Sequence, residues 1–239
     1  SINIQLKPSI SIYVADPDGD SMDVSINITN ADDGWQKITY NGVGNGTYSI
    51  TDDMKNHINT SGKTYYWVVS VFDGIYRVTE VYHFTTKPVQ NMRTGECYDT
   101  IQDAIDGADA GDTLFVYSGI YCENLLITKS INIIGENKAS TIIMGIEENR
   151  DATIHVSYAN KVNISNLTIR NTDGENYLGF GILMENTNNS IIYNCNLSKN
   201  LEGMRLIDSH FNKIKKCNIF SNRWGIVLFE DANNNEVSD

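Results

Sequence analysis

The last third of the chain repeats a short apolar pattern every 22 residues. A glycine followed by an apolar residue opens each unit, at Gly181, Gly203 and Gly225. The same interval relates Cys195 to Cys217, Asn196 to Asn218, Leu197 to Ile219 and Asn200 to Asn222. A unit this short cannot enclose a core of its own, so successive units must stack against one another. The repeat therefore predicts a solenoid whose coils lie about 4.8 Å apart and contain three short strands each.

Stacked coils place like residues above one another, so we predict that the three glycines form one column. The alternation within each unit predicts the residues that line the interior: Ile182, Met184, Ile192, Cys195 and Leu197. We expect Asn196 and Asn218 to face outward and to hydrogen-bond across the coils. One unit earlier, eight inserted residues would place Ser165, Asn166 and Leu167 below Cys195, Asn196 and Leu197. A leucine-rich repeat of similar length is the alternative, but its helix-forming segment is missing.

Residues 100–136 predict how the solenoid begins. Apolar residues at helical spacing give one face to a short helix: Ile101, Ala104, Ile105 and Ala108. Thr100 and Asp103 form a plausible capping pair, and Gly111-Asp112 ends the helix. Strand patterns follow at 113–117, 125–127 and 131–134. A helix that cannot bury its face alone is expected to seal the end of the coil stack.

This stretch resembles the start of right-handed parallel β-helix proteins. The resemblance rests on Thr100-Ile101-Gln102-x-Ala104-Ile105, Gly111-Asp112-Thr113, Gly119-x-Tyr121-x-Glu123, Ile127-x-Lys129-x-Ile131 and Ile134-Gly135. Proteins of this kind include pectin-lyase-like enzymes and the NosD-type carbohydrate-binding and sugar-hydrolase repeat family. The resemblance implies a β-helix with an N-terminal capping helix over residues 94–239, with the C-terminal part truncated. It does not imply one activity, because the capped fold occurs with and without catalysis.

The first 87 residues have the short strands and turns of a β-sandwich. Strand patterns lie at 9–14, 22–28, 35–40, 46–50, 64–71 and 78–85. The segments DPDGD, TYYWVVSVFDG and YHFTT resemble the immunoglobulin-like or fibronectin-type-III-like modules of prokaryotic cell-surface proteins. The resemblance implies a spacer or binding module, with Trp67 as the core aromatic residue between the sheets. We expect a sandwich at 1–87, a linker at 88–93 and an all-β chain throughout.

The charge balance limits the partners. Lys plus Arg number 18 against 30 Asp plus Glu, which gives a net charge of −12. Nucleic acid and anionic membranes are therefore poor partners. No apolar run approaches the roughly 20 residues of a membrane helix. Because the chain opens on Ser1 and stops at Asp239 inside a repeat, we expect it to be a mature or excised piece of a longer protein.

An acidic loop in the first half is a candidate cation site. Asp16, Asp18 and Asp20 offer carboxylates to Ca²⁺, which takes oxygen ligands, and Asp73 could add a fourth from a turn at the same end of the sandwich. The alternative is an ordinary polar turn with Pro17 and Gly19. The spacing is not that of an EF-hand.

Candidate glycan-binding residues lie mainly around an insert in the solenoid. Inserts in solenoids map to loops on one face, which is often the binding face. Aromatic rings can stack on sugars while carboxylates bind hydroxyl groups. We therefore predict a ligand-binding group of Asp173, Glu175, Tyr177, Tyr193 and Trp224.

Catalysis would need paired carboxylates for glycoside hydrolysis. Asp208 and Asp231 are 23 residues apart, one step off the repeat, and could lie on neighbouring coils near Glu230. They are weak candidates, because Asp at such positions commonly bounds a turn. We find no constellation of Gln, Asp and Arg like that of pectin methylesterases, no metal spacing and no Ser-His-Asp pattern.

Cysteines and sequons suggest modifications. A disulfide between Cys97 and Cys122 could join the cap to the first coil, whereas we expect Cys195 and Cys217 to be buried thiols. Seven N-x-S/T sequons are possible glycosylation sites, at Asn27, Asn45, Asn59, Asn163, Asn166, Asn188 and Asn196.

These patterns favour a non-catalytic protein of the cell surface or extracellular space. Its predicted role is structural, adhesive or glycan-binding, with polysaccharides, glycoprotein glycans, cell-envelope proteins or other copies of itself as partners. Self-assembly into a lattice, as in an S-layer, would use the open coil end. The alternative is a polysaccharide lyase or glycoside hydrolase of the β-helix class.

Overall fold

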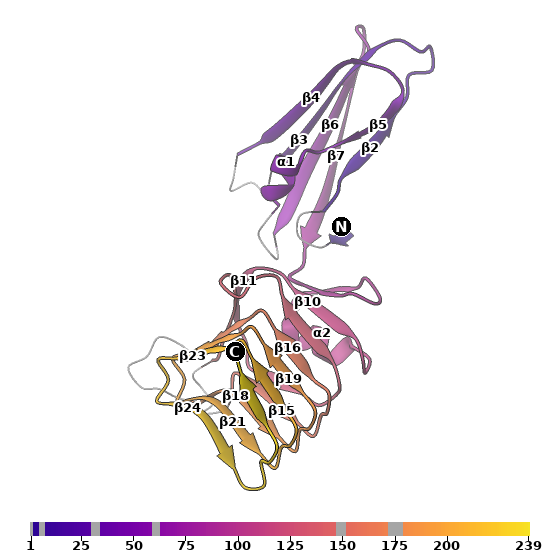
Figure 1. The fold of residues 1–239 in the computed structure, drawn as a ribbon. Coiled ribbons are helices and arrows are strands. Elements are labelled where there is room, and N and C mark those ends of the chain that lie inside the picture. The colour runs from indigo at the N-terminus through magenta and orange to yellow at the C-terminus, as the bar shows by residue number, and fades with distance from the viewer. Residues whose placement is uncertain (1, 5–7, 30–33, 59–62, 147–151, 172–178) are drawn as a thin grey trace. The chain divides into compact units, whose positions relative to one another are not determined.

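The computed structural model describes residues 2–4, 8–29, 34–58, 63–146, 152–171 and 179–239. The chain divides into two compact units, Ser1–Lys87 and Pro88–Asp239, which we describe separately (Figure 1). Strands dominate both units, as predicted. None of the helices in the described residues is long and apolar enough to cross a membrane.

The N-terminal unit consists of two sheets and a short helix. Its larger sheet has the strand order β1-β7-β6-β3-β4 and its smaller sheet pairs β2 with β5. The bounds are β1 Ile2–Ile4, β2 Ser11–Val14, β3 Met22–Thr29, β4 Gln36–Val43, β5 Gly46–Ser49, α1 Asp52–Asn56, β6 Thr64–Phe72 and β7 Arg77–Thr86. The six predicted strands all form, and each begins within two residues of its predicted start. Strand β1 and helix α1 were not predicted.

The core of this unit lies between the two sheets. Ile26 and Ile28 of β3 and Tyr65 of β6 are buried against Ile10 and Ile50, which flank the smaller sheet. The unit's helix α1 begins after Thr51, whose side chain accepts a hydrogen bond from the Met54 backbone at 3.3 Å. This capping bond satisfies one of the free amides of the first turn. Because only two strands face five, part of the larger sheet stays uncovered.

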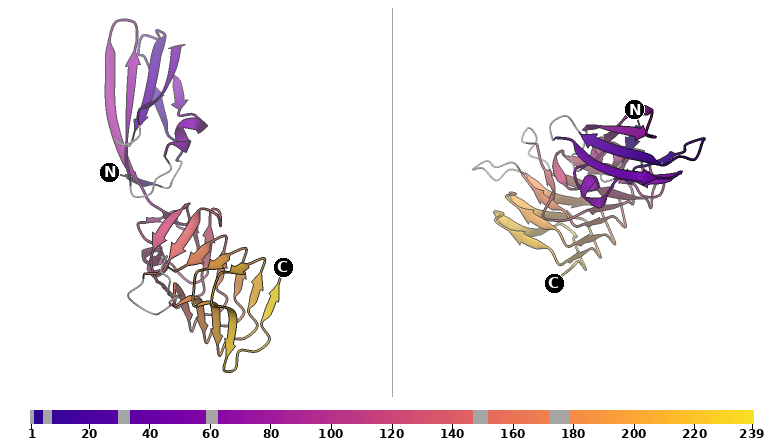
Figure 2. Two further views of the ribbon diagram at one scale, coloured as in Figure 1. Left: turned by 90° about the vertical axis from the view of Figure 1, so that its left-hand side faces the viewer. Right: turned by 90° about the horizontal axis from the view of Figure 1, so that it is seen from above.

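The C-terminal unit is a stack of coils built from three sheets (Figures 1 and 2). Strands β10 to β24 form successive triplets, one strand for each sheet, and every strand with a counterpart in the next coil pairs with it in parallel. The first sheet has the order β25-β22-β19-β16-β13-β10-β8-β9, the second β11-β14-β17-β20-β23 and the third β12-β15-β18-β21-β24. This is the parallel β-helix that the repeat predicts.

The elements of this unit are short, as the 22-residue repeat requires. Their bounds are β8 Val89–Asn91, β9 Cys97–Tyr98, α2 Ile101–Gly107, β10 Thr113–Val116, β11 Gly119–Cys122, β12 Leu125–Ile127, β13 Asn132–Gly135, β14 Thr141–Met144, β15 Ile154–Ser157, β16 Asn163–Ser165, β17 Thr168–Arg170, β18 Phe180–Glu185, β19 Ile191–Tyr193, β20 Asn196–Ser198, β21 Glu202–Ile207, β22 Lys213–Lys215, β23 Asn218–Phe220, β24 Trp224–Phe229 and β25 Glu236–Ser238.

The glycine column is confirmed. A Cβ atom on Gly181 would lie 2.5 Å from the carbonyl oxygen of Gly203, and one on Gly203 would lie 2.7 Å from that of Gly225. These distances are too short for any side chain, so the first two positions require glycine. The predicted interior residues Ile182, Met184, Ile192, Cys195 and Leu197 are all buried. The outward ladder also forms, since Asn218 Nδ2 donates to Asn196 Oδ1 at 3.0 Å.

The predicted register of the third coil is wrong by two residues. Ser165 pairs with Tyr193 and Ile169 with Leu197, so the offset is 28 residues and the insertion is six residues rather than eight. Leu167, not Ser165, lies below Cys195, because the Asn196 amide donates to the Leu167 carbonyl at 2.9 Å. The cause is Asn166, which occupies the turn between β16 and β17 with φ of 58° instead of a strand position.

The turns of the β-helix stack as regularly as its strands. The described non-glycine residues with positive φ form four columns: Tyr158, Asn186, Asp208 and Glu230; Lys161, Asn189, Phe211 and Asn234; Asn166, Asn194 and Lys216; and Lys199 and Ser221. Asparagine tolerates this conformation better than most residues. Side-chain amides link the coils at buried turns, where the Ser190 amide donates to Asn212 Oδ1 and the Asn212 amide to Asn235 Oδ1, both at 2.9 Å.

The N-terminal end of the β-helix is closed by helix α2, as predicted. Its apolar side chains Ile101, Ala104 and Ile105 are buried in the β-helix core. Thr100 accepts a hydrogen bond from the Asp103 amide at 3.0 Å, which confirms the predicted cap. Gln102 links helix α2 to strand β12: its side chain accepts a hydrogen bond from the Leu126 backbone amide at 2.9 Å and donates one to the Leu126 carbonyl at 3.3 Å.

Residues 88–93 are not a linker. Strand β8 lies within them and pairs antiparallel with β10, so this segment forms the first strand of the β-helix sheet. A buried carboxylate holds it in place: Asp112 accepts hydrogen bonds from Asn91 Nδ2 at 2.6 Å and from the Arg93 guanidinium. These bonds, that of Arg93 first, lower the pKa of Asp112 well below its usual range. The sequence suggested a linker because Pro88 marks a change of pattern, but the pairing continues directly after it.

Candidate functional site

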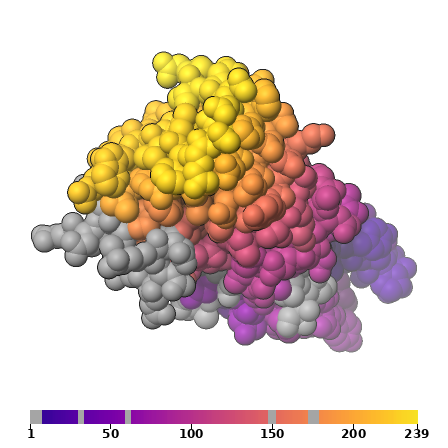
Figure 3. Space-filling view, turned by 90° about the horizontal axis from the view of Figure 1, so that it is seen from below, coloured from indigo at the N-terminus to yellow at the C-terminus, as the bar shows by residue number. Residues whose placement is uncertain are grey.

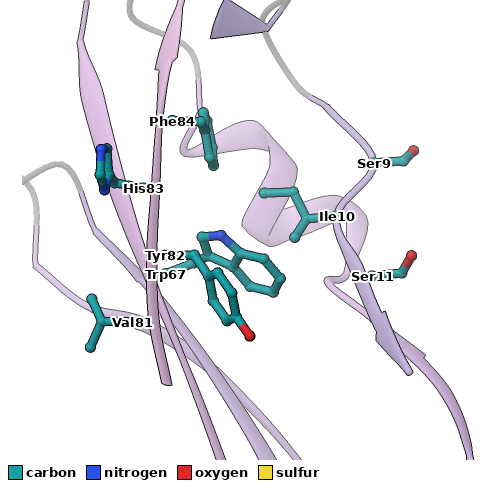
Figure 4. Close-up of a pocket in the computed structure, with 8 residues that line it drawn as sticks. All are labelled: Ser9, Ile10, Ser11, Trp67, Val81, Tyr82, His83 and Phe84. Carbon is teal, nitrogen blue, oxygen red and sulfur yellow. The ribbon is translucent and has the colours of Figure 1, made fainter. Parts of the chain in front are cut away.

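An aromatic cleft lies at the open edge of the N-terminal unit. A pocket of about 490 Å³ is lined by Ser9, Ile10, Ser11, Trp67, Val81, Tyr82, His83 and Phe84. Figure 4 shows Ile10, Trp67, Tyr82 and Phe84 converging between the hairpin β6–β7 and the chain that leads into β2. Val81 and His83 point to the opposite side of the hairpin, and the hydroxyl groups of Ser9 and Ser11 point away from the cleft. The floor is therefore aromatic, and the cleft is bordered on both sides by backbone.

Trp67 and Tyr82 form the centre of this cleft. They are direct cross-strand partners on β6 and β7, and their ring centroids lie 4.7 Å apart with an interplanar angle of 30°. Tyr82 is 38% exposed although it projects from the same face as the core residue Phe84, which is 4% exposed. Trp67, predicted to be a core residue, is only partly buried against the core. The two rings together offer a broad apolar face with a polar atom at each edge.

The cleft is open because strand β7 is poorly covered. Beyond β6, its described pairing is with β1 and extends only over Phe84, Thr85 and Thr86. The neighbouring residues from Arg77 to His83 are all exposed. On the opposite face of the same hairpin, a second pocket of about 500 Å³ is lined by Thr29, Gly34, Trp35, Tyr66, Val68 and Val81. Strand alternation separates the two aromatic surfaces, so each can be altered without touching the other.

Two residues of the predicted glycan-binding group, Tyr193 and Trp224, lie in the described part of the β-helix, and these two do not share a surface. Asp173, Glu175 and Tyr177 lie outside the described residues. Tyr193 is on β19 in the first sheet and Trp224 is on β24 in the third, so their side chains belong to different faces of the coil. The physical reason is their register: Tyr193 stacks on Lys215, whereas Trp224 stacks on Glu202.

Trp224 nevertheless has aromatic and charged neighbours on the third sheet. Its column also holds Phe180 and Glu202. The Arg205 guanidinium lies 4.4 Å from the centre of the Phe180 ring and forms an ion pair with the buried Glu202. On the other side Arg205 lies 5.9 Å from the centre of the Phe229 ring. This arrangement was not predicted, although the 22-residue spacing of Phe180, Glu202 and Trp224 in the sequence indicates that the three residues share a column.

The predicted carboxylates do meet at one turn. Asp208 and Glu230 stack in the positive-φ column, with φ of 46° and 55°. The pKa of Glu230 is raised, first because its carboxyl hydrogen-bonds with that of Asp208 and then because of the negative charge there. Asp231 contributes its backbone amide, which donates to Asp208 Oδ1 at 3.4 Å. On the preceding coils, His155 Nε2 contacts Glu185 Oε2 at 3.2 Å.

Comparison with known families agrees with this architecture. Residues 116–239 match the family described as the right-handed beta helix region. The chain belongs to this family. The matched region begins with the last residue of β10 and contains the later coils, the Arg205 surface and the Asp208–Glu230 turn. None of the curated proteins matches the chain.

The predicted calcium loop of this right-handed β-helix protein, Asp16 to Asp20, lies in the N-terminal unit. Asp16 Oδ1 accepts hydrogen bonds from the amides of Asp18 at 2.8 Å and Gly19 at 2.9 Å, which is the geometry of a polar turn. Asp73 follows Phe72, the partner of Asp23, so its turn lies at the same end of the sheet. Within the described residues, His, Cys, Asp and Glu side chains form no group of three that could hold a metal. Calcium binding by Asp16, Asp18, Asp20 and Asp73 stays a prediction.

None of the four cysteines of the β-helix protein forms a disulfide in the structure. The predicted disulfide between Cys97 and Cys122 is therefore absent. Cys97 lies on β9, beside the cap, with its thiol 3.7 Å from the Gly95 carbonyl, whereas Cys122 is exposed at the end of β11. Cys195 is buried and Cys217 half-buried, as thiols.

The sequons of this protein occupy different environments. Asn45 is exposed, but its amide nitrogen donates to the Asp16 carbonyl at 3.3 Å and its oxygen accepts from the Asp16 amide at 2.7 Å. Asn163 Nδ2 donates to Asn132 Oδ1 at 2.6 Å, within the stacked ladder. Asn27 and Asn188 are half-buried, and Asn59 lies outside the described residues. Glycosylation at these positions stays a prediction.

Proposed function

We propose that this protein is a non-catalytic, glycan-binding protein of the cell surface or extracellular space. In this proposal the Trp67–Tyr82 cleft binds the ligand and the β-helix serves as a rigid support. The observation that carries the proposal is the pair of aromatic rings, 4.7 Å apart, held at the open edge of a sheet. Aromatic faces of this kind bind the apolar face of a sugar ring, and polar atoms at the ring edges and the strand backbone bind its hydroxyl groups.

The fold of the N-terminal unit supports the surface role. Its strand order, with a five-stranded sheet β1-β7-β6-β3-β4 facing the pair β2-β5, is compatible with an immunoglobulin-like or fibronectin-type-III-like module. The acidic net charge of −12 is compatible with neutral polysaccharides and with glycoprotein glycans as partners. These features support a cell-envelope location and an adhesive role as parts of the same proposal.

A glycan array followed by calorimetry on the best ligand tests this function. Trp67→Ala and Tyr82→Ala should each weaken binding by about tenfold or more, since aromatic contacts contribute on the order of 1 kcal/mol beyond their buried area. Tyr66→Ala is the matched control: Tyr66 neighbours Trp67 in sequence and is 43% exposed, but it faces the opposite side of the hairpin. Equal losses in the three variants, or unchanged binding in Trp67→Ala and Tyr82→Ala, would contradict the proposed site.

Calcium and self-association belong to the same proposal as separate questions. Ca²⁺ at Asp16, Asp18, Asp20 and Asp73 should raise the melting temperature of the chain, and EDTA should reverse the rise. Asp73→Asn should reduce this response. A melting temperature that Ca²⁺ leaves unchanged would contradict the calcium site.

Association through the exposed last coil should appear as concentration-dependent sedimentation, and Leu228→Glu should abolish it. A chain that stays monomeric at all concentrations would contradict self-association.

Glycoside hydrolysis is a second candidate because of one observation. Asp208 and Glu230 stand on successive coils, and the raised pKa of Glu230 suits a general acid beside a second carboxyl group. A reducing-sugar assay on polysaccharides tests it. Turnover that disappears in Glu230→Gln and in Asp208→Asn would establish this function in place of the non-catalytic one. Turnover that persists in both variants would exclude this pair as the catalytic group.

A further inference from the structure

Two thiols lie directly above one another in the interior of the β-helix. The register of β20 and β23 pairs Asn196 with Asn218, so Cys195 and Cys217 occupy the same position in successive coils. The Asn218 amide donates to the Cys195 carbonyl at 2.8 Å. Neighbouring parallel strands place such residues about 4.8 Å apart, which is within the Cα separation of a disulfide.

The two side chains have the same orientation. Each thiol contacts the carbonyl oxygen two residues earlier: Cys195 Sγ that of Tyr193 at 3.4 Å and Cys217 Sγ that of Lys215 at 3.3 Å. The position below Cys195 holds Leu167, which offers no sulfur. Cys97 and Cys122 lie in β9 and β11, at the other end of the β-helix. Cys195 and Cys217 are therefore each other's partners.

The pair is asymmetric. Cys195 is buried, whereas Cys217 is only partly buried. A hydrogen bond from the Cys195 thiol lowers the pKa of Cys217, and the Lys138 ammonium acts in the same direction. Lys138 is held nearby, since its Nζ donates to Asn194 Oδ1 at 2.7 Å in the turn before Cys195. A partly exposed thiol beside a cation is the environment of a reactive cysteine.

We propose that Cys195 and Cys217 are an oxidation site that forms a reversible disulfide between two coils when the protein meets hydrogen peroxide. The Cys217 thiolate attacks one peroxide oxygen, an S–O bond forms, the O–O bond breaks and water is released after protonation. Cys195 then attacks the sulfur of the Cys217 sulfenic acid, the S–S bond forms, the S–O bond breaks and a second water leaves. Two thiols are oxidised and one peroxide is reduced to two waters.

The parallel orientation makes this disulfide reversible. Cβ atoms in a disulfide lie about 3.8 Å apart, closer than the spacing of two stacked strands. The bond must draw the two coils together locally, and strained disulfides are more readily reduced than structural ones. We therefore expect dithiothreitol to restore both thiols under native conditions.

The test uses the full chain and hydrogen peroxide, with Cys97 and Cys122 replaced by serine. Mild oxidation should remove two maleimide-reactive thiols, yield one peptide pair joining Cys195 to Cys217 on non-reducing digestion, and form no disulfides between chains. In Cys195→Ser, Cys217 should stop at a sulfenic acid that dimedone traps. Peptide mapping of the unsubstituted chain gives the same answer if the replacements disturb folding.

Lys138→Gln tests whether the Lys138 charge activates Cys217, because a purely structural role of Lys138 would not change the pH dependence of oxidation. The oxidation rate of Cys217 at neutral pH should fall by about threefold or more, and its pH midpoint should move up towards that of an ordinary thiol. Three results would overturn the proposal: a persistent sulfenic or sulfinic acid without a Cys195–Cys217 bond, disulfides between chains only, or two unreacted thiols where an exposed cysteine such as Cys122 is already oxidised.

Discussion

The two ends of the β-helix are built from strands of the same kind but differ in what covers them. At the N-terminal end, helix α2 and strand β8 cover the first coil, and residues such as Ile105 and Leu114 are 1% and 0% exposed. At the C-terminal end, Leu228 and Val237 are 55% and 61% exposed, although their counterparts Leu206 and Ile214 one coil earlier are 0% and 1% exposed. Figure 3 shows the C-terminal part of the chain, in yellow, at the surface of the molecule.

This difference shows where burial comes from in such a fold. Leu206 and Leu228 are the same residue type in the same column, on strands of equal length. Only the presence of a next layer distinguishes them. Burial in a coil stack is therefore a nearest-neighbour property, and the helix α2 provides at one end what a further coil provides elsewhere. Substitutions at the two ends should differ accordingly.

The largest difference is expected from truncating the cap. Ile105→Ala should lower the free energy of unfolding of the β-helix by about 2–5 kcal/mol, since it leaves a cavity under the first coil. The matched change at the other end, Ile226→Ala, should cost about 1 kcal/mol or less because this residue is only partly buried. Urea unfolding followed by circular dichroism measures both. Equal losses would mean that the two ends are equally covered in solution.

The glycine column offers the next comparison. Gly203→Ala should destabilise by about 1–3 kcal/mol, because its Cβ would lie 2.7 Å from the Gly225 carbonyl oxygen. At Gly225 the nearest atom is 3.9 Å away, so Gly225→Ala should be neutral or stabilise by about 0.5 kcal/mol through the unfolded chain. Thermal unfolding of the pair checks the prediction. A loss at Gly225 as large as that at Gly203 would indicate that another layer covers the last coil.

A smaller effect is expected at the edge of β12. Gln102→Ala removes two hydrogen bonds to the Leu126 backbone and should cost about 1 kcal/mol. Gln102→Glu keeps the acceptor for the Leu126 amide but loses the donor and places a negative charge beside Asp106, to which Gln102 Nε2 donates at 2.8 Å, so it should retain protection of the Leu126 amide without restoring the full stability. Hydrogen exchange at the Leu126 amide gives the local readout. Unchanged protection in Gln102→Ala would show that the strand edge does not depend on this side chain.

The smallest expected effect is the change in stability as the pH is lowered from neutral. It has opposite signs at the two ends of the β-helix. Hydrogen bonds from Arg93 and Asn91 lower the folded pKa of Asp112, so its stabilisation is present above about pH 4 and is lost as the pH falls further. Asp208 raises the folded pKa of Glu230, so the repulsion there is relieved as Glu230 protonates. Acid unfolding should therefore start at the cap, and Asp112→Asn should flatten the acid limb of the stability curve. Hydrogen exchange at pH 3 that is faster in the last coil than in α2 would contradict this.

The sequence specified the regular parts of this fold well. The 22-residue spacing of Gly181, Gly203 and Gly225 is sufficient to place them in one column, because a rigid repeat fixes register. The apolar face and cap of α2 follow from local chemistry at Thr100 and Ile105. The predicted strands of the N-terminal unit also form, since alternation of buried and exposed residues is a local property.

The remaining features depend on how many strands each sheet contains and on where each turn begins, which this sequence alone does not show. The Trp67–Tyr82 cleft exists because two strands face five, and strand alternation predicts only that Trp67 points towards the core face. The register of the third coil was missed because Asn166 looks like a strand residue but occupies a turn. The separation of Tyr193 from Trp224, by contrast, could have been read from the 22-residue period.

The six extra residues between β17 and β18 have a practical consequence. The strands on either side keep their pairing, with Ile169 beneath Leu197 and Ile182 beneath Met204. The coil therefore accepts added length at this corner without a change in its neighbours. The equivalent corners between β20 and β21 and between β23 and β24 are natural places to graft display loops, at intervals that the stacking distance of about 4.8 Å would set in advance.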